Sequence, residues 1–363
     1  MNAQRSAIVI GGGIIGLACA WRLAQAGWAV TLLDAAAESR EASWAAAGML
    51  APHHEADEPG PLWWLGMASL ERWPEFADAL GGADALDLRM VGGLLPILDQ
   101  GDSDEAARKL AFLAAEGVAG ERLTGAALAS AEPALAVSCG EALRLPAGHV
   151  NPRLTCLRLR EACTALGVAL RFGAAVAQLD GTRVVAVDGS TLTADEVVLA
   201  SGAWTPALAH LAGIPLSGEP VKGQLLRFAA PDGLLRHFIH SHHAYLVPRH
   251  GQGVVVGATM VESGFDRSQD VQAIARLAAG ARRLVPALAQ AEIVETWTGL
   301  RPRLKGGLPV IGRVRPGLIL ATGHFRNGVL LTPISADIVA CIAAQVPPPC
   351  EVGPFSCPGG TSA

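Results

Sequence analysis

The fold is decided by residues 8–16, IVIGGGIIG, which LACAWRLAQAGWAVTLLDA follows at 17–35. A β-branched run enters a glycine cluster, and an alanine-rich stretch leaves it. Gly11, Gly13 and Gly16 have the GxGxxG spacing. In that spacing the glycines permit a tight turn, the close approach of a pyrophosphate and the packing of a helix on a strand. The stretch therefore predicts a dinucleotide-binding loop.

The residues around this loop complete a βαβ unit. We expect a strand over 7–10, a helix over 14–26 that presents its N-terminus to phosphate, and a strand over 28–33. Asp34 follows this strand, 18 residues after Gly16, where an acid can hold a ribose 2′-hydroxyl. The fold class is predicted to be α/β, with a Rossmann-like domain at its start.

The composition of the chain limits the classes of protein and of partner that are possible. The 363 residues, 51% hydrophobic and 17% charged, suit a packed enzyme of two domains. The net charge of −5 and the absence of a basic run argue against nucleic acid as a partner. No apolar run reaches the roughly 18 residues of a membrane span, and the first residues do not resemble a signal peptide. We expect a cytoplasmic protein that does not bind membranes.

The order of helical and strand patterns along the chain indicates that a second domain is inserted into the nucleotide-binding domain. Residues 62–137 are mainly helical, whereas 221–228, 238–248 and 253–258 read as antiparallel strands. EVVLAS and GLILAT, far apart in sequence, read as strands that join the first sheet. We expect a discontinuous nucleotide domain over 1–60, 150–218 and 300–346, a substrate domain over 61–149 and 219–299, and a disordered tail over 347–363.

A series of motifs carries a family resemblance. AAAGML, HVNP, VVLASGAW, PVKGQLL, YLVPR, VVVGATM, GLRP and GHFRNGVLL follow the glycine loop in this order. The set resembles the FAD-dependent D-amino acid oxidase superfamily, and more closely the glycine oxidases of thiamine biosynthesis. The resemblance implies an FAD-binding domain of the glutathione-reductase type with an inserted α+β substrate domain built on an antiparallel sheet.

The resemblance extends the set of residues expected to contact the cofactor beyond those of the glycine loop. The whole set is Gly11, Gly13, Ile14, Ile15, Gly16, Asp34, Ala35, Ala42, Ser43, Ala47, Gly48, Met49, Val176, Gly202, Trp204, His324, Phe325, Arg326, Asn327, Gly328, Val329 and Leu330. Ala42 stands where a hydroxyl residue can contact phosphate, and Ser43 supplies a hydroxyl beside it.

The resemblance also implies a substrate site, made of Arg301, Arg326, Tyr245, His243 and Met49. Arg301 offers a planar fork that matches a carboxylate at two points. No acid–base residue is required, because a neutral amine can transfer hydride from Cα to the flavin once it is oriented.

Two absences refine the expected chemistry. Covalent flavoproteins of this superfamily attach the flavin to a cysteine between the GLRP-like and GHF-like segments. Residues 302–323 contain none, so FAD should be non-covalent. His240 and His242 lack the carboxylate or cysteine partners of a metal site, and no metal is expected.

The expected reaction is the oxidation of glycine or another small amine by O2, with peroxide, the α-keto acid and ammonia as products. In thiamine synthesis the iminoacetate itself would be used for the thiazole. One alternative is a D-amino acid or sarcosine dehydrogenase with another electron acceptor. Another is a non-catalytic FAD-binding subunit of a larger oxidase, which the presence of Arg301 disfavours. Relatives suggest a homotetramer.

Overall fold

The computed structural model describes residues 4–38 and 40–357. The predicted βαβ unit is confirmed within one or two residues: strand β1 (Ser6–Ile10), helix α1 (Ile14–Gln25) and strand β2 (Ala29–Asp34). β1 and β2 are parallel neighbours. The glycine loop therefore lies at the carboxyl end of a parallel strand, as a nucleotide site of this class requires.

A six-stranded sheet grows from this unit. Its order is β18 (Val310–Arg315), β19 (Leu318–Thr322), β12 (Glu196–Leu199), β1, β2 and β8 (Ala169–Phe172). β12 pairs in parallel with both β1 and β19, which confirms that segments distant in sequence share one sheet. Only β18 runs antiparallel to its neighbour.

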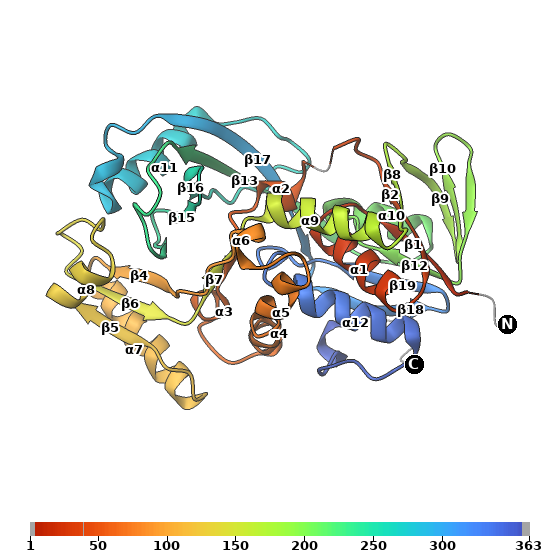
Figure 1. Ribbon diagram of the computed structural model, residues 1–363, viewed down its shortest axis with the longest axis horizontal. Helices are drawn as coiled ribbons and strands as arrows, with labels where there is room; N and C mark the ends of the chain where they lie inside the picture. The colour runs from red at the N-terminus through yellow and green to blue at the C-terminus, as the bar shows by residue number, and fades with distance from the viewer. Residues whose placement is uncertain (1–3, 39, 358–363) are drawn as a thin grey trace.

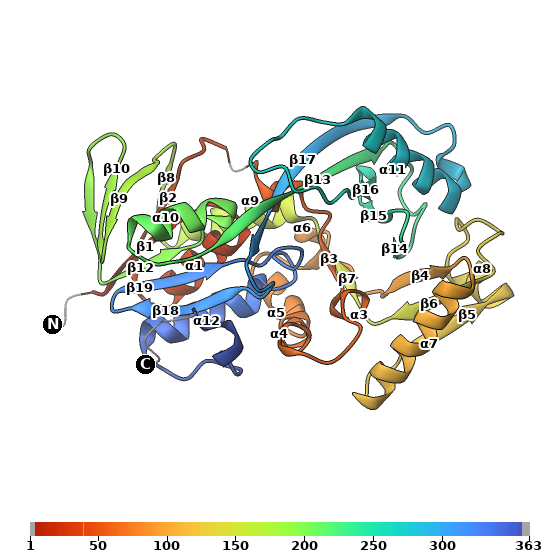
Figure 2. The ribbon, with the colours of Figure 1, turned by 180° about the vertical axis from the view of Figure 1, so that it is seen from behind.

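Helices and a small sheet cover the two faces of this sheet (Figures 1 and 2). The helices α1, α9 (Pro152–Ala165) and α12 (Thr332–Ala344) share one large apolar cluster. A second cluster joins the opposite face to helix α10 (Thr205–Leu211) and to β9 (Val176–Asp180), β10 (Arg183–Ala186) and β11 (Thr191–Thr193). The result is a three-layered unit, and the α/β fold class predicted from the sequence is confirmed.

An eight-stranded, mostly antiparallel sheet forms the other half of the molecule (Figure 1). Its order is β17 (Ile293–Leu304), β13 (Gly218–Phe228), β16 (Gly253–Gly257), β15 (Tyr245–Arg249), β14 (Phe238–His240), β4 (Gly93–Ile97), β6 (Glu141–Leu145) and β5 (Glu121–Thr124). Helices α7 (Gln100–Ala115), α8 (Gly125–Ala131) and α11 (Val271–Leu284), with a short 3-10 turn η2 (Pro286–Leu288), complete this half.

The remaining elements are short. They lie mostly between the two sheets or beside the half of the molecule that contains the six-stranded sheet and the glycine loop, which we call the nucleotide half. They are α2 (Ala42–Ala45), α3 (Pro52–Glu55), α4 (Pro61–Leu70), α5 (Trp73–Asp78), α6 (Ala83–Leu86), the strands β3 (Met49–Leu50) and β7 (Gly148–His149), and the 3-10 turns η1 (Gly202–Trp204) and η3 (Gly353–Phe355). α4 and α5 share the apolar cluster of α1 and α12, although they lie within residues 61–149, which are expected to belong to the substrate domain. The domain boundaries themselves stay a prediction.

Two expectations from the sequence are wrong. Residues 238–248 form two strands, because the backbone N–H and the hydroxyl of Ser241 both donate to the Ala244 carbonyl and turn the chain between them. The expected disordered tail is ordered as far as it is described. Phe355 and Cys357 are buried, and Phe355 packs in the cluster around α1. Residues 358–363 of that tail lie outside the described residues.

Strand β17 links the two halves. Its first residue packs in the cluster under α11, Trp297 packs in a cluster between the sheets, and Leu304 packs in the nucleotide half. β13 pairs with it from Gly218↔Leu304 to Phe228↔Ile293. Because this long ribbon spans the junction, side chains near its carboxyl end, Arg301 among them, are carried to the nucleotide half.

Candidate active site

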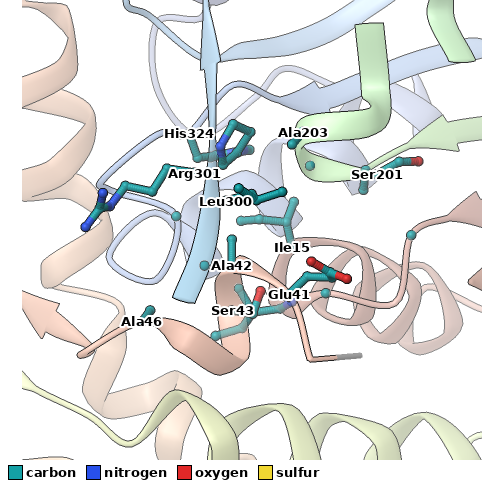
Figure 3. A pocket seen from close by; sticks show the side chains of 18 of the residues that line it. Ile15, Glu41, Ala42, Ser43, Ala46, Ser201, Ala203, Leu300, Arg301 and His324 are labelled. Atoms are coloured by element: carbon teal, nitrogen blue, oxygen red, sulfur yellow. Dashed lines mark hydrogen bonds between the residues drawn. The ribbon is translucent and has the colours of Figure 1, made fainter. Parts of the chain in front are cut away.

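A cavity of ≈ 600 Å³ lies where the carboxyl ends of β1, β12 and β19 face the ribbon of β13 and β17 (Figure 3). Residues at or just after those strand ends, Ile10, Ser201 and Thr322, line one side of it, and Leu225 and Arg301 line the other. Its volume falls in the range of small-molecule and cofactor sites.

The glycine loop shapes one end of this cavity. Gly11 has φ +117°, and a side chain there would meet the backbone of Ala200. A methyl group on Gly16 would overlap the Gly11 carbonyl, so the helix can approach the strand only with glycine at this position. These are the first and third roles that the sequence pattern assigns, the tight turn and the close packing of helix on strand, and they leave a cradle of bare backbone for phosphate.

The N-terminus of α1 faces the same space. Gly13 precedes the helix and supplies no side-chain cap, while the Ile14 N–H donates to the Ser43 hydroxyl oxygen at 2.9 Å. Gly13, Ile14, Ile15 and Ser43 all line the cavity. Free N–H groups and the partial positive charge of a helix N-terminus favour a pyrophosphate here. Ser43 is thus fixed where the hydroxyl proton remains able to donate to that group.

Asp34 stands at the rim of the cradle. Its carboxylate accepts from the backbone N–H groups of Gly12 and Ala36, the latter at 2.7 Å. A carboxylate can accept about four hydrogen bonds, so acceptor capacity remains for ribose hydroxyls. The position agrees with the role predicted for Asp34, which stays a prediction.

The turn at residues 45–49 is held from both sides. Trp297 donates its indole N–H to the Ala45 carbonyl at 2.9 Å, and the buried Arg249 donates to the Ala47 carbonyl. Gly48 has φ +78°, and a side chain there would overlap the Val150 carbonyl. The turn therefore presents small residues and backbone, with Met49 beside them, to the cavity in one fixed arrangement.

Three glycines lie on the adjacent strands β17, β13 and β16, and we call them the glycine floor: Gly299 and Gly223, which line the opposite end of this cavity, and Gly257, which lines a second cavity beside it. A methyl group on Gly223 would overlap the Arg301 guanidinium, and one on Gly257 would overlap the Tyr245 phenol. The two side chains lie over these bare positions because no other side chain occupies them.

Arg301 and Tyr245 lie side by side in the cavity. One Arg301 nitrogen, Nη1, donates to the Thr259 carbonyl at 3.1 Å. Burial raises the pKa of Tyr245, and the charge of Arg301 opposes that shift without reversing it. At neutral pH the pair thus offers a guanidinium and a neutral phenol, both of which donate hydrogen bonds to a carboxylate.

Arg326 is already paired. Its Nη2 donates to the Glu55 carboxylate at 2.8 Å, and both residues line the cavity. His324 lies behind it and contacts the Ser335 hydroxyl at 2.9 Å. Burial lowers the pKa of His324 to about 3, so this ring is neutral at physiological pH. The charge on this side of the cavity is therefore determined by Arg301, Arg326 and Glu55.

The structure gathers nearly all predicted site residues. Of the predicted residues, Gly16 and Leu330 do not line the cavity; Gly16 acts by packing, and Leu330 is buried behind it. His243 is exposed and lines a second cavity beside the first. The residues that sequence reasoning missed include Glu41, Glu55, Ser201, Gly223 and Gly299. The glycines could have been found, since glycine inside a strand pattern indicates a close approach.

Two further observations concern other kinds of site. Within residues 4–38 and 40–357, no three histidine, cysteine or acidic side chains are grouped as a metal site would need. In the same part of the chain, no helix combines the length and apolarity needed to cross a membrane.

Comparison with known proteins agrees with this geometry. The DAO family, described as FAD dependent oxidoreductase, matches residues 6–342. A glycine oxidase of Geobacillus kaustophilus is 32% identical over 98% of this chain and 97% of its own. The crystal structure of the glycine oxidase from that organism superposes with a TM-score of 0.92, at 30% identity, covering 99% of this chain and all of that chain.

Two more proteins are similar over most of this chain. A bifunctional ThiO/ThiG protein of Nostoc sp. is 34% identical over 94% of this chain, which corresponds to 53% of the larger protein. The structure of an iminodiacetate oxidase from Chelativorans sp. BNC1 superposes with a TM-score of 0.87, at 25% identity, covering 98% of this chain and 100% of that one.

Proposed function

The chain belongs to the DAO family of FAD-dependent oxidoreductases, and from that premise we propose that it oxidatively deaminates glycine and other small amines, such as sarcosine and small D-amino acids. O2 is the acceptor, and the products are the imine or α-keto acid, ammonia or an amine, and H2O2. The iminoacetate would be used for the thiazole of thiamine, a role that the ThiO/ThiG relative supports.

The observation that carries the proposal is a single cavity that joins the glycine cradle to a half-buried arginine, Arg301. FAD is the cofactor of the family, and the bare backbone of Gly11, the N-terminus of α1 and the rim carboxylate of Asp34 fit its pyrophosphate and ribose. When bound, FAD supplies the electron acceptor, which takes a hydride equivalent from the substrate Cα and passes the electrons to O2.

The protein's own residues orient the substrate. Arg301 binds the carboxylate at two points, Tyr245 donates a further hydrogen bond, and Gly223 and Gly257 leave the room that these two side chains occupy. The Glu55–Arg326 pair closes the opposite wall. Holding a small amine in this fixed geometry is the main contribution of the protein to the rate.

A peroxide-coupled screen tests the function. The purified holoenzyme should release H2O2 with glycine, sarcosine or D-alanine, and consume one O2 for each turnover. Reduction of a dye or quinone without peroxide would instead identify a dehydrogenase. If none of the amines tested bleaches the flavin, the protein is a non-catalytic subunit.

We propose that the FAD is bound without a covalent link. The segment between Arg301 and His324 contains no cysteine, and within the described residues the cysteines Cys156, Cys163 and Cys341 lie outside the cavity lining. Acid or heat should therefore release all of the flavin into the supernatant. Flavin fluorescence that migrates with the denatured polypeptide on a gel would contradict this prediction.

Asp34→Ala is expected to weaken FAD binding more than substrate binding. The change removes the ribose acceptor, at about 1.5–3 kcal/mol for a hydrogen bond to a charged group, so the Kd for FAD should rise roughly ten- to hundredfold. Asp34→Asn keeps one acceptor oxygen and should lose less. Fluorescence titration of the apoprotein measures the Kd, and a value equal to that of the unaltered protein would show that Asp34 is not the ribose ligand.

We further propose that the protein acts in the cytoplasm as a homo-oligomer, with a tetramer as the expected state. Sedimentation of the holoenzyme tests the assembly, and a monomer at micromolar concentration would exclude it.

A further inference from the structure

A second cavity of ≈ 460 Å³ opens from the first. Tyr245, Arg301 and Arg326 line both cavities, so the two meet at the residues assigned to the substrate. Glycine, held by its carboxylate on Arg301, has no atom that could extend into the second cavity. The inference below rests on the proposed function and concerns what a larger substrate would place there.

The inner end of this second cavity is rich in positive charge. Lys109 is only 2% exposed, and its ammonium donates to the carbonyls of His53 at 3.2 Å and Ala56 at 2.6 Å. Its acidic partner, Asp57 at 3.3 Å, is 85% exposed and therefore well screened by water. Arg326 uses Nη2 for Glu55, which leaves other donors of its five-donor fork for a ligand.

Two histidines between these cations have unsatisfied nitrogens. Nδ1 of the His240 ring has no hydrogen-bond partner among the described residues. The His54 ring is buried and makes one contact with the Gly93 backbone, which leaves its other nitrogen without a partner. The two rings lie 6.1 Å apart, and both line the second cavity. A buried polar atom without a partner costs about 1–3 kcal/mol, so a ligand that accepts from these rings would relieve that cost.

The nearby charges favour an anion as that ligand. Burial lowers the pKa of His54 and of His240, and the charge of Lys109 lowers both further. A hydrogen bond to the Gly93 backbone opposes the shift at His54, and the charge of Glu55 opposes it at His240. An anion in the cavity would offset these cations and accept N–H donors from the rings. Neutral imidazole donates one hydrogen bond, and imidazolium donates two.

Acidic residues limit how far the anion can extend. Asp102 and Glu105 line the outer end, and their carboxylates contact the His242 ring at 3.5 and 3.3 Å. A second anionic group carried on a long chain would meet these carboxylates and be repelled. The favoured ligand is therefore one whose second anionic group lies a few atoms from the first.

We infer that the second cavity binds a second carboxylate of the substrate, so that the preferred amines are short dicarboxylates, with Arg301 holding one carboxylate and His54, His240 and Arg326 holding the other. Iminodiacetate carries the second carboxylate on nitrogen, and D-aspartate carries it on the side chain. For iminodiacetate the reaction balances as iminodiacetate + O2 + H2O → glyoxylate + glycine + H2O2. The Cα–H and C–N bonds break, and O2 is reduced to peroxide.

A binding experiment tests the inference without turnover. Glutarate is iminodiacetate with CH2 in place of NH, and butyrate is the matching analogue of sarcosine; neither can be oxidised as an amine. Calorimetry with the holoenzyme should give a Kd for glutarate at least tenfold below that for butyrate. Equal Kd values would overturn the inference, whether or not the protein oxidises glycine.

Variants of the two histidines test whether they bind the second carboxylate. His240→Asn and, separately, His54→Asn should reduce the glutarate advantage to less than threefold. His210→Asn, an exposed histidine that lines neither cavity, should leave the advantage intact. Because the comparison of glutarate with butyrate in the unaltered protein needs no variant, a failure of either variant to fold leaves the test standing. A full advantage retained in both cavity variants would overturn the assignment.

Peroxide assays then show whether the second carboxylate is carried on the nitrogen or on the side chain of the substrate. Preference for iminodiacetate over sarcosine places it on nitrogen, and preference for D-aspartate over D-alanine places it on the side chain. D-ornithine preferred over D-alanine, with no dicarboxylate preference, would mean that Asp102 and Glu105 select a cation and would overturn the inference. Tight glutarate binding with no oxidation of any amine would instead contradict the proposed function and support the binding site.

Discussion

Replacing Arg301 with Ala is expected to lower kcat/KM for glycine by about two to three orders of magnitude. The change removes one member of a buried charge pair with the substrate carboxylate, which typically costs about 2–5 kcal/mol. The guanidinium is fixed by the Thr259 carbonyl and lies over Gly223, so its fork is held in place before substrate arrives.

Arg301→Lys should recover only part of this loss, because a point charge does not reproduce the two-point contact. The flavin spectrum should persist in both variants, and an amine without a carboxylate should lose much less activity than glycine. Steady-state peroxide assays give these ratios. Near-normal kcat/KM for every amino acid tested would move the carboxylate site elsewhere, with Arg326 as the first candidate.

Gly16→Ala is expected to abolish FAD retention and to lower Tm. The added methyl would overlap the Gly11 carbonyl, a backbone atom that cannot move without opening the cradle. Alanine is favoured over glycine inside a helix by about 1 kcal/mol, so a loss cannot come from helix propensity. It must come from the separation of α1 and β1.

Gly140→Ala is the matched control, because Gly140 is exposed and no atom lies within 4 Å of the position of its added Cβ. The control should keep both the visible absorbance of its bound flavin and its Tm. Absorbance and thermal melts of the two purified variants decide the matter. A Gly16→Ala protein that is as yellow and as stable as the control would show that the close helix–strand contact is not needed.

The nucleotide half was predictable because its signals are local. The strand, glycine loop, helix and acid at 8–34 lie within one short stretch, and their geometry depends on neighbours in sequence. The hairpin at 238–249 was not predictable from alternation, since its turn is closed by backbone and side-chain hydrogen bonds of one serine, Ser241. The packing of Phe355 depends on an apolar surface formed by distant helices, which a proline-rich composition does not indicate.

The site shows the same difference between local motifs, which could be predicted, and contacts between distant residues, which could not. Residues in dense motifs, from Ala47 to Met49 and from His324 to Val329, were found by resemblance, and the structure places them at the cavity. The pairing of Arg326 with Glu55 joins residues 271 positions apart, and nothing in the spacing of either could indicate it. The same holds for the second cavity, whose histidines and Lys109 come from three separate elements or loops.

The glycine floor has a thermodynamic consequence. Glycine inside a strand is less favourable than alanine by about 0.5–1 kcal/mol, chiefly because the unfolded chain has more freedom to lose. Three such positions on β17, β13 and β16 lower the stability of the sheet by roughly 1.5–3 kcal/mol, a noticeable part of the 5–15 kcal/mol that holds a typical domain folded. Thermal robustness therefore competes at these three residues with the space that Arg301, Tyr245 and Ala45 occupy, and stabilising substitutions would have to be sought elsewhere in the chain.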